Sequence, residues 1–299
     1  MIRIGVQWAP ALEGAELKEF ARELEDLGYF SLGFPDHFFI GHKDPLPTLE
    51  PFSAMAFAAA VTTRLRLVSI VAANDFRNPA LFARSIASLD MLSAGRIEAG
   101  IGAGWYGPEF DAVGIVFDKP SIRIERLEEA IGVAKAYWTK DIVEHAGKYY
   151  SVNGLPRVLD VVQQPHPPLL IGAGGDKMLA LAGRHADVVG LTSSLRDFEN
   201  RERMLDEMRP SSIARKVALV RSSAVDAGRD LDQIIFQTQI NSIDFDQEDP
   251  GHLWALTGEP SKMMETLEER AEMGITYFML RERRRDVLRE FGEKVVSKL

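Results

Sequence analysis

Apolar residues recur along this chain in two alternating patterns. Short runs are continuously apolar and rich in β-forming residues, and each is followed by a longer segment whose apolar residues recur three or four positions apart. In the first pair, residues 2–8 are the apolar run and residues 15–27 are the longer segment, which Gly28 ends. A predicted strand followed by a predicted helix is therefore the repeating unit of the chain.

Eight such units are predicted. The strands are expected at residues 2–8, 31–34, 65–72, 97–103, 169–173, 188–191, 234–240 and 276–280. The helices are expected at 15–27, 52–63, 79–92, 122–138, 177–184, 261–273 and 286–299, with 197–228 mostly helical. Strands that are apolar throughout are typical of parallel sheets wrapped by helices. The pattern predicts an α/β fold, a single (β/α)8 TIM-barrel domain over 1–299. We favour it over a doubly wound open sheet because the repeat continues evenly to the C-terminus.

Two segments interrupt the repeat. Residues 35–51 form a long loop with four prolines and both His37 and His42, and a loop of that length inside a compact domain is usually functional. Residues 142–168 contain a hairpin-like piece at 142–152. We interpret this second segment as an insertion between the fourth and fifth units rather than as a separate domain.

Composition narrows the possible functions. The formal net charge of −9 argues against a nucleic-acid partner, because proteins that bind phosphate backbones usually present a basic face. The chain has no cysteine for disulfide or thiolate chemistry, and its six histidines lack the spacing of metal ligands, so we expect no metal. No apolar stretch is long enough to cross a bilayer and the N-terminus does not resemble a signal peptide, so we expect a soluble cytoplasmic protein.

In such a barrel, the strand ends and loops at the C-terminal face build the site. Asp36 and His37 follow the second strand, and a carboxylate next to an imidazole suits acid–base chemistry or cofactor contact. The same pair would also suit a turn aspartate and a histidine packed against its aromatic neighbours. The aromatic residues expected to line the site suggest a fairly apolar substrate; they are Trp8, Phe38, Phe39, Trp105 and Tyr106.

Glycine-rich segments follow the fourth and fifth strands, at 100–109 and 172–176. Glycines let a flat ligand approach the backbone, although plain glycine-rich turns are the alternative. The second segment leads into a helix whose first N–H groups could bind a phosphate unless Asp176 caps them. Four arginines after the eighth strand either bind phosphate or form the solvated start of the last helix, which we favour; they are Arg281, Arg283, Arg284 and Arg285.

Motifs of metal hydrolases, nucleotide-binding loops and serine hydrolases are missing from the chain. It contains no His-Glu-x-x-His, no P-loop and no Gly-x-Ser-x-Gly sequence. A barrel with glycine-rich loops and aromatic walls, but without a metal or nucleophile motif, favours a bound planar cofactor that brings its own reactivity.

Several longer motifs resemble those of the luciferase-like monooxygenase superfamily, and more narrowly of its branch that depends on the deazaflavin coenzyme F420. The resemblance covers nearly the whole chain. Its most specific parts are TTRLRL at 62–67, RNP at 77–79, LDMLSAGR at 89–96 and GIGAGW at 100–105, with support from PDH at 35–37, PHPP at 165–168 and LTGEP at 256–260. The resemblance implies a (β/α)8 barrel with an insertion, a small-molecule substrate and a homodimer.

The resemblance also implies roles for individual residues. Asp36 and His37 would lie beside the cofactor ring, where His37 would stabilise charge or move a proton during hydride transfer. A non-proline cis peptide bond between Ile70 and Val71 would support the ring. The positions expected to bind the cofactor are Asp36, Ile70, Val71, Ala72, Gly104 and Trp105 around the ring, and Gly174, Gly175 and Thr192 around the phosphate-bearing tail.

One position departs from the family pattern. Some members that oxidise sugar phosphates place a glutamate just after the fourth-strand glycines, where this chain has Trp105, and the next carboxylate is Glu109. The candidate catalytic residues are therefore His37, Asp36 and Glu109, and a sugar phosphate is the less expected substrate.

Three functions stay open at this point. Hydride transfer between F420 and an organic substrate is the leading hypothesis, and an FMN-dependent monooxygenase that uses reduced flavin and O2 is the alternative. A third hypothesis is a non-catalytic barrel that binds a flavin-like ligand. F420 has a carbon where flavin has the nitrogen beside its oxygen-reacting centre, so it favours hydride transfer over oxygen chemistry. Only the family match at Asp36 and His37 separates the first two hypotheses.

Overall fold

Eight parallel strands close into a barrel. The computed structural model describes residues 1–40, 46–195, 199–247 and 251–299. In sequence order the barrel strands are β1 (Arg3–Gln7), β2 (Ser31–Phe34), β5 (Arg66–Ser69), β7 (Ile97–Gly102), β10 (Leu169–Ala173), β11 (Val188–Leu191), β12 (Ile235–Ile240) and β15 (Ile275–Leu280). Neighbours pair in the order β10-β11-β12-β15-β1-β2-β5-β7, and a pairing between β10 and β7 closes the ring. The predicted (β/α)8 fold is confirmed.

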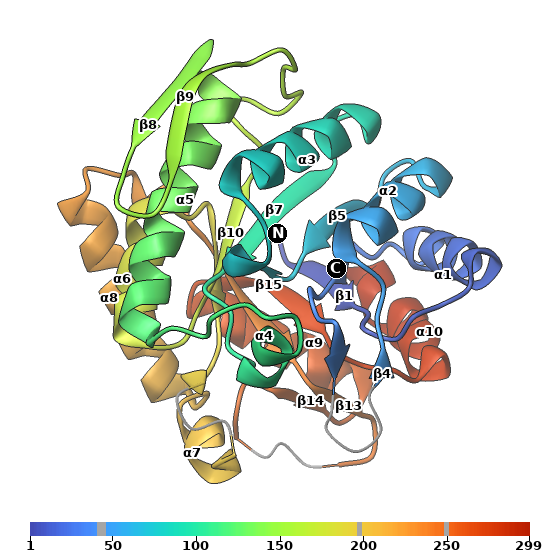
Figure 1. Ribbon diagram of the computed structural model, residues 1–299. Helices are drawn as coiled ribbons and strands as arrows, with labels where there is room; N and C mark the ends of the chain where they lie inside the picture. Colours follow the sequence, from blue (N-terminus) through green and yellow to red (C-terminus); the bar gives the residue numbers. More distant parts are fainter. Residues whose placement is uncertain (41–45, 196–198, 248–250) are drawn as a thin grey trace.

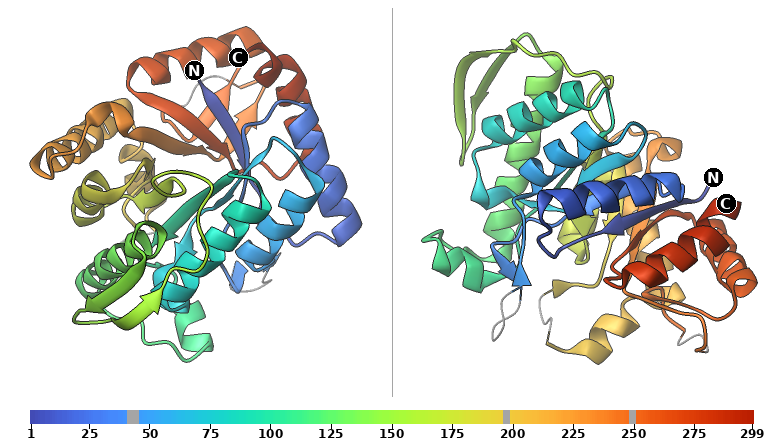
Figure 2. Two further views of the ribbon diagram at one scale, coloured as in Figure 1. Left: turned by 90° about the horizontal axis from the view of Figure 1, so that it is seen from above. Right: turned by 90° about the vertical axis from the view of Figure 1, so that its right-hand side faces the viewer.

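Helices surround this barrel on the outside (Figure 2). They are α1 (Gly14–Asp26), α2 (Pro51–Val61), α3 (Pro79–Leu92), α5 (Pro120–Thr139), α6 (Asp176–His185), α8 (Pro210–Asp226), α9 (Pro260–Glu272) and α10 (Arg285–Lys294). Five of them begin with proline at a position where its missing N–H costs nothing. The described residues also contain two short helices, α4 (Gly107–Ala112) and α7 (Arg201–Asp206), and the 3-10 turns Asn74–Phe76, Leu231–Gln233 and Val296–Lys298.

The structure differs from the predicted elements in three places. The third predicted strand is broken: β5 ends at Ser69, the Ile70–Val71 peptide bond is cis, and β6 (Ala72–Ala73) pairs with β7 again. The segment predicted as mostly helical divides into α7 and α8. The predicted last helix ends as α10 before the 3-10 turn at the C-terminus. These ends depend on tertiary contacts that leave no periodic pattern in the sequence.

Both interruptions of the repeat contain small sheets. The segment after α5 forms the antiparallel hairpin β8 (Ile142–Ala146) and β9 (Ser151–Pro156), beside α5 at the upper left of Figure 1. This hairpin confirms the predicted insertion between the fourth and fifth units. The loop after β2 holds β3 (Phe39–Ile40) paired with β4 (Leu46–Pro47), while His42 lies outside the described residues. A further pair, β13 (Ser242–Asp244) and β14 (Ala255–Thr257), follows β12.

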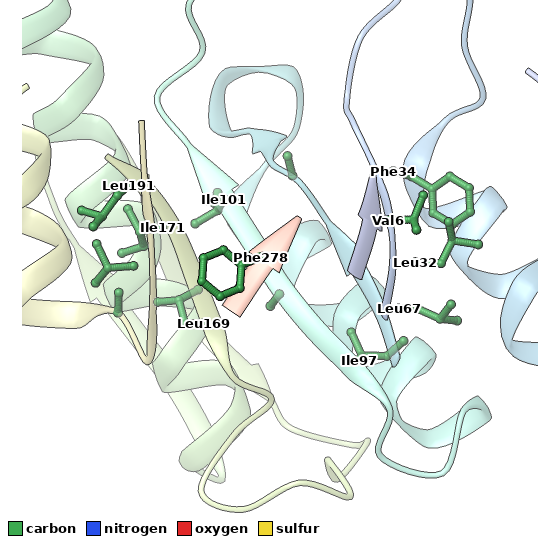
Figure 3. Close-up of a cluster of buried hydrophobic side chains, with 14 of the residues drawn as sticks. Val6, Leu32, Phe34, Leu67, Ile97, Ile101, Leu169, Ile171, Leu191 and Phe278 are labelled. Carbon is green, nitrogen blue, oxygen red and sulfur yellow. The ribbon is translucent and has the colours of Figure 1, made fainter. Parts of the chain in front are cut away.

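Side chains of the barrel strands alternate between two apolar layers. One layer packs between the strands and the helices, and Figure 3 shows members of it: Val6, Leu32, Phe34, Leu67, Ile97, Ile101, Leu169, Ile171, Leu191 and Phe278. The intervening positions fill the barrel interior with Val68, Ile70, Leu170, Val188, Tyr277 and Met279. The strands are thus buried on both faces, which explains why they are apolar without alternation.

A polar network closes one end of the interior. The Tyr277 hydroxyl lies 2.5 Å from Ser31 Oγ and donates to Glu98 Oε2 at 3.2 Å, and Arg66 Nε lies 2.9 Å from Glu98 Oε1. These residues stand at the N-terminal ends of their strands. The opposite end, where the strands have their C-terminal residues, is where a site is expected in such a barrel. Several small elements gather at that end, at the bottom of Figure 1: α4, α7 and the β3–β4 and β13–β14 pairs.

Two features are absent from the described residues. No helix there is long and apolar enough to cross a membrane. No group of three or more histidine, aspartate or glutamate side chains in the same residues could hold a metal ion.

Candidate active site

A cavity of about 1340 Å³ opens at the C-terminal ends of the barrel strands. It brings together nearly all of the predicted site residues, which are Asp36, His37, Ile70, Val71, Gly104, Trp105, Glu109, Gly174, Gly175 and Thr192. Ala72 is the exception, because it is fully buried and its neighbour Ala73 lines the cavity instead. The loops after β2, β5, β7, β10 and β11 therefore converge on one space, as the barrel topology requires.

His37 is held from behind by a buried carboxylate. Its Nδ1 lies 2.7 Å from Oε2 of Glu109, which α4 positions and which is 1% exposed. The other oxygen of Glu109 accepts hydrogen bonds from the backbone N–H groups of Phe38 at 2.6 Å and Phe39 at 3.1 Å. Both oxygens are therefore engaged by the loop after β2, and Glu109 fixes the position of that loop and of the imidazole.

Asp36 faces a different partner from its neighbour His37. Its carboxylate forms a bidentate ion pair with Arg77, at 2.5 and 3.0 Å, and accepts a hydrogen bond from the backbone N–H of Ala73 at 2.8 Å. Arg77 also lies over the ring of Phe52, 4.8 Å from its centroid. Asp36 thus ties the loop after β2 to the segment after β6, a structural role that the sequence alone does not separate from cofactor contact.

Aromatic residues form one wall, but not all of those expected. Trp105 is 37% exposed and stands edge-on to His37, with ring centroids 5.8 Å apart. Trp8 instead packs against Phe20 in the core, at a centroid distance of 4.5 Å. The aromatic residues that line the cavity are Phe76, Trp105, Tyr106, Phe110 and Trp254, so Trp8, Phe38 and Phe39 are not among them.

The glycines at the end of β7 allow other side chains of the protein to pack closely against the backbone. A Cβ on Gly104 would lie 2.5 Å from the Phe110 ring, and its φ of +72° also favours glycine. A Cβ on Gly102 would lie 2.8 Å from the side chain of Val71, whose backbone forms the break between β5 and β6. Packing against Val71 and Phe110 therefore already requires glycine at both positions, and both glycines also line the cavity.

The far end of the cavity offers backbone donors at the start of α6. Gly175 precedes this helix, and no side chain caps its first N–H groups. The possible cap, Asp176, instead pairs with Arg215 at 3.0 Å. Ser193 lines the same end and is fully buried, and its Oγ has no hydrogen-bond partner among the residues that the structure describes. Free N–H groups at a helix start and a free hydroxyl suit a phosphate.

A buried lysine beside this end was not predicted. Lys216 is 1% exposed, and its Nζ donates to the Thr192 carbonyl at 2.5 Å and to Glu207 Oε2 at 3.1 Å. Burial lowers the pKa of Lys216, and the nearby Glu207 only partly opposes this. The residue lies within α8, outside every motif found in the sequence, so periodicity offered no signal for it.

Amide side chains on β12 were also missed. Gln237 and Gln239 line the cavity because alternate residues of this strand face the barrel interior. Gln239 Nε2 donates to Gln7 Oε1 at 2.9 Å, and Gln237 Nε2 has no partner within the described part of the chain. Two glutamines two residues apart in one strand could have signalled this, since such positions share one face.

Comparison with known proteins agrees with this architecture. The family model described as luciferase-like monooxygenase matches residues 3–249. An F420-dependent glucose-6-phosphate dehydrogenase from Kineococcus radiotolerans is 34% identical over 187 residues, which are 60% of this chain and 52% of that protein. An FMNH2-dependent dimethylsulfone monooxygenase from Pseudomonas putida is 30% identical over 128 residues, 43% of this chain and 35% of that protein.

Among solved structures, the coenzyme F420-dependent tetrahydromethanopterin reductase from Methanopyrus kandleri superposes with a TM-score of 0.81 at 19% identity, covering 99% of each chain. At that identity the likeness concerns the fold. The chain spans about half the length of the first curated relatives that it matches, since the matched region is 52% of each of those proteins. The family match extends over most of the chain and includes every element that carries His37, Glu109 and the start of α6. This chain belongs to the luciferase-like monooxygenase family.

Proposed function

We propose that this protein is an oxidoreductase that transfers a hydride between coenzyme F420 and a small organic substrate. The observation that carries the proposal is the His37–Glu109 pair in the wall of the large cavity. The names of relatives such as the Kineococcus enzyme support F420, as does the resemblance at Asp36 and His37.

The described residues fit a flat cofactor with a phosphate tail. The cavity of about 1340 Å³ exceeds the usual volume of a small-molecule site, roughly 300–1,000 Å³, so it has room for a ring and a substrate together. Ile70, Val71 and Trp105 would contact the ring, and Gly175 with Ser193 would hold the phosphate at the start of α6. Bound there, the deazaflavin would supply the carbon that donates or accepts the hydride.

His37 would serve this chemistry through its second ring nitrogen. Nδ1 is occupied by Glu109, whereas Nε2 makes no hydrogen bond to another residue in the described ranges. Holding one nitrogen fixes both the tautomer and the direction in which the other points. His37 would therefore donate a hydrogen bond or move a proton at Nε2, and Glu109 would stabilise the imidazolium without contacting the substrate.

The choice of cofactor is tested by titrating the purified protein with F420 and, separately, with FMN while following cofactor fluorescence. We expect tighter binding of F420, because Asp36 and His37 match the pair that the deazaflavin branch places beside its cofactor ring. Equal or tighter binding of FMN would replace the proposal with the FMN-dependent monooxygenase, which the Pseudomonas relative favours. Tight binding of F420 without reduction or oxidation by any alcohol, aldehyde or ketone in a broad panel would favour the non-catalytic barrel.

Assembly and location are part of the same proposal. We expect a homodimer in the cytoplasm, on the strength of the family resemblance. Sedimentation of the purified chain checks the first expectation, since a mass of one 33.3 kDa chain at micromolar concentration would contradict it.

A further inference from the structure

A second, smaller cavity of about 310 Å³ adjoins the main one. Gln7, Asn241 and Arg281 line both cavities, and Ala9 and Arg283 complete the smaller one. We call this smaller cavity the annex. Four of its five lining side chains are polar, and two of them are guanidinium groups.

Neither guanidinium of the annex has an acidic partner among the residues that the structure describes. The next two arginines in the sequence do have acidic partners. Arg284 pairs with Glu282 at 2.7 Å, and Arg285 pairs with Glu23 at 2.8 Å. The chain carries 44 acidic and 35 basic residues, so acids are plentiful. Only part of the arginine group is therefore the structural start of α10 that the sequence favours.

The charges of the two annex arginines are close together. Enclosure in the cavity wall lowers the pKa of Arg281 and the positive charge of Arg283 lowers it further, although both side chains keep part of their surface exposed. The other polar groups nearby are neutral amides. Gln7 accepts from Gln239, and Gln237, which is 2% exposed, has an Nε2 without an acceptor in the adjoining cavity wall. Two neighbouring guanidinium groups that lack an acidic partner among the described residues suit a ligand that carries negative charge and presents paired oxygens.

The annex and the proposed phosphate end are built on different strands. The annex residues stand at the C-terminal ends of β12, β15 and β1, whereas the start of α6 and Ser193 follow β10 and β11. In the closed order these five strands are consecutive, so the two places lie side by side along the ring without sharing a strand. An anion in the annex would thus belong to a different part of the bound molecules from the cofactor phosphate.

We propose that the annex binds an oxyanion of the substrate, a carboxylate or a phosphate ester, through Arg281 with help from Arg283, Gln7 and Asn241. This inference rests on the proposed function in assuming that the adjoining main cavity is the reaction site. Both groups present paired oxygens to a guanidinium, which binds them in a bidentate manner. The substrate would then lie with its charged end in the annex and its reacting end towards His37.

The test needs neither F420 nor the substrate. Binding of succinate and of inorganic phosphate is measured by calorimetry for the wild type, for Arg281→Gln and for Arg289→Gln. Arg289 is the matched control, because it lies on α10, pairs with Glu23 and lines neither cavity. We expect the wild type and the control to bind one of the two anions, and Arg281→Gln to bind it about tenfold or more weakly.

Each result decides the proposal. Preferential binding of succinate identifies a carboxylate substrate, and preferential binding of phosphate identifies a phosphate ester. Binding that is unchanged in Arg281→Gln would place the anion elsewhere, such as the start of α6, and would overturn the proposal, as would no binding by the wild type. If Arg281→Gln fails to fold, Arg283→Gln, at an exposed position of the annex, replaces it with the same expectation.

Discussion

At the scale of single residues, the partner of a side chain decides what that side chain can do. Asp36 and His37 are adjacent in the chain, yet Asp36 binds Arg77 whereas His37 binds Glu109. The first is a bidentate ion pair that joins two loops. The second leaves one imidazole nitrogen for a ligand, so only His37 has the properties of an acid–base residue.

Substitution of this pair separates the two roles. We expect His37→Ala to lower the hydride-transfer rate by about 10²–10⁴-fold, because it removes the proton-handling group. Glu109→Gln should cost less, roughly 10–100-fold, because it leaves the imidazole in place but weakens the group that orients it. Stopped-flow absorbance of F420 measures both rates, and fluorescence titration checks that the cofactor still binds.

The control for these variants is Glu125→Gln, on the exposed face of α5, which should keep the wild-type rate. A wild-type rate in His37→Ala would remove this residue from the mechanism. A larger loss in Glu109→Gln than in His37→Ala would contradict the positioning role of Glu109.

At the scale of elements, single side chains anchor segments that have little stability of their own. The β8–β9 hairpin is fastened to α5 by Glu129, which accepts from Tyr150 N at 2.7 Å, Tyr149 N at 3.0 Å and His145 Nε2 at 3.0 Å. A two-stranded hairpin is marginal in water without such packing. Burial raises the pKa of Glu129, but the hydrogen bonds from His145 and from the two backbone N–H groups outweigh it, so the net shift is downward.

This downward shift predicts how pH affects the hairpin. Because the folded-state pKa of Glu129 is lowered, its contribution to stability is present above the ordinary glutamate pKa and is lost as pH falls through the folded value. We expect Glu129→Gln to speed hydrogen exchange at the Tyr149 and Tyr150 amides at pH 7. The difference from the wild type should shrink below about pH 4.

Mass spectrometry of exchanged peptides measures this effect. Glu144→Gln, on the exposed side of β8, is the control and should exchange like the wild type. Equal protection of Tyr149 and Tyr150 in wild type and Glu129→Gln at pH 7 would show that other contacts hold the hairpin.

At the scale of the whole molecule, closing the barrel imposes its strictest demands on side-chain size. β5 and β7 approach so closely that a Cβ on Gly100 would lie 1.7 Å from the Ser69 carbonyl oxygen. Ser69 Oγ also exchanges hydrogen bonds with the backbone of Gly100, at 2.8 and 3.0 Å. These two residues are far apart in the chain, and the requirement arises only when the ring of strands closes.

We therefore expect Gly100→Ala to lower the free energy of unfolding by about 3 kcal/mol, since backbone must move to admit the methyl group. Gly132→Ala is the contrasting variant. A Cβ there would meet nothing within 4 Å on the exposed face of α5, so alanine should raise the free energy of unfolding by about 0.5–1 kcal/mol. Urea denaturation compares the two, and a Gly100→Ala protein as stable as the wild type would refute the steric argument.

The sequence predicted most of the fold because its elements are long and repetitive. All eight barrel strands and their flanking helices carry their own apolar pattern, and the resemblance added the cis bond at Ile70–Val71, which is confirmed. The helix α4 has only six residues, too few for a periodic signal, and was not predicted. The annex and Lys216 were likewise missed, because their residues come from separate elements.

By itself, the sequence determined the alternation of strands and helices, and with it a closed barrel whose loops meet at one end. That outcome follows from local patterns, in which each apolar stripe must be buried against its neighbours. Only the tertiary structure decided the partners: that Glu109 reaches His37 across 72 residues, that glycines serve packing, and that Arg281 lines the annex, whose described lining residues include no acid. Contacts between distant residues depend on how the barrel closes, and a periodic pattern along the chain does not predict them.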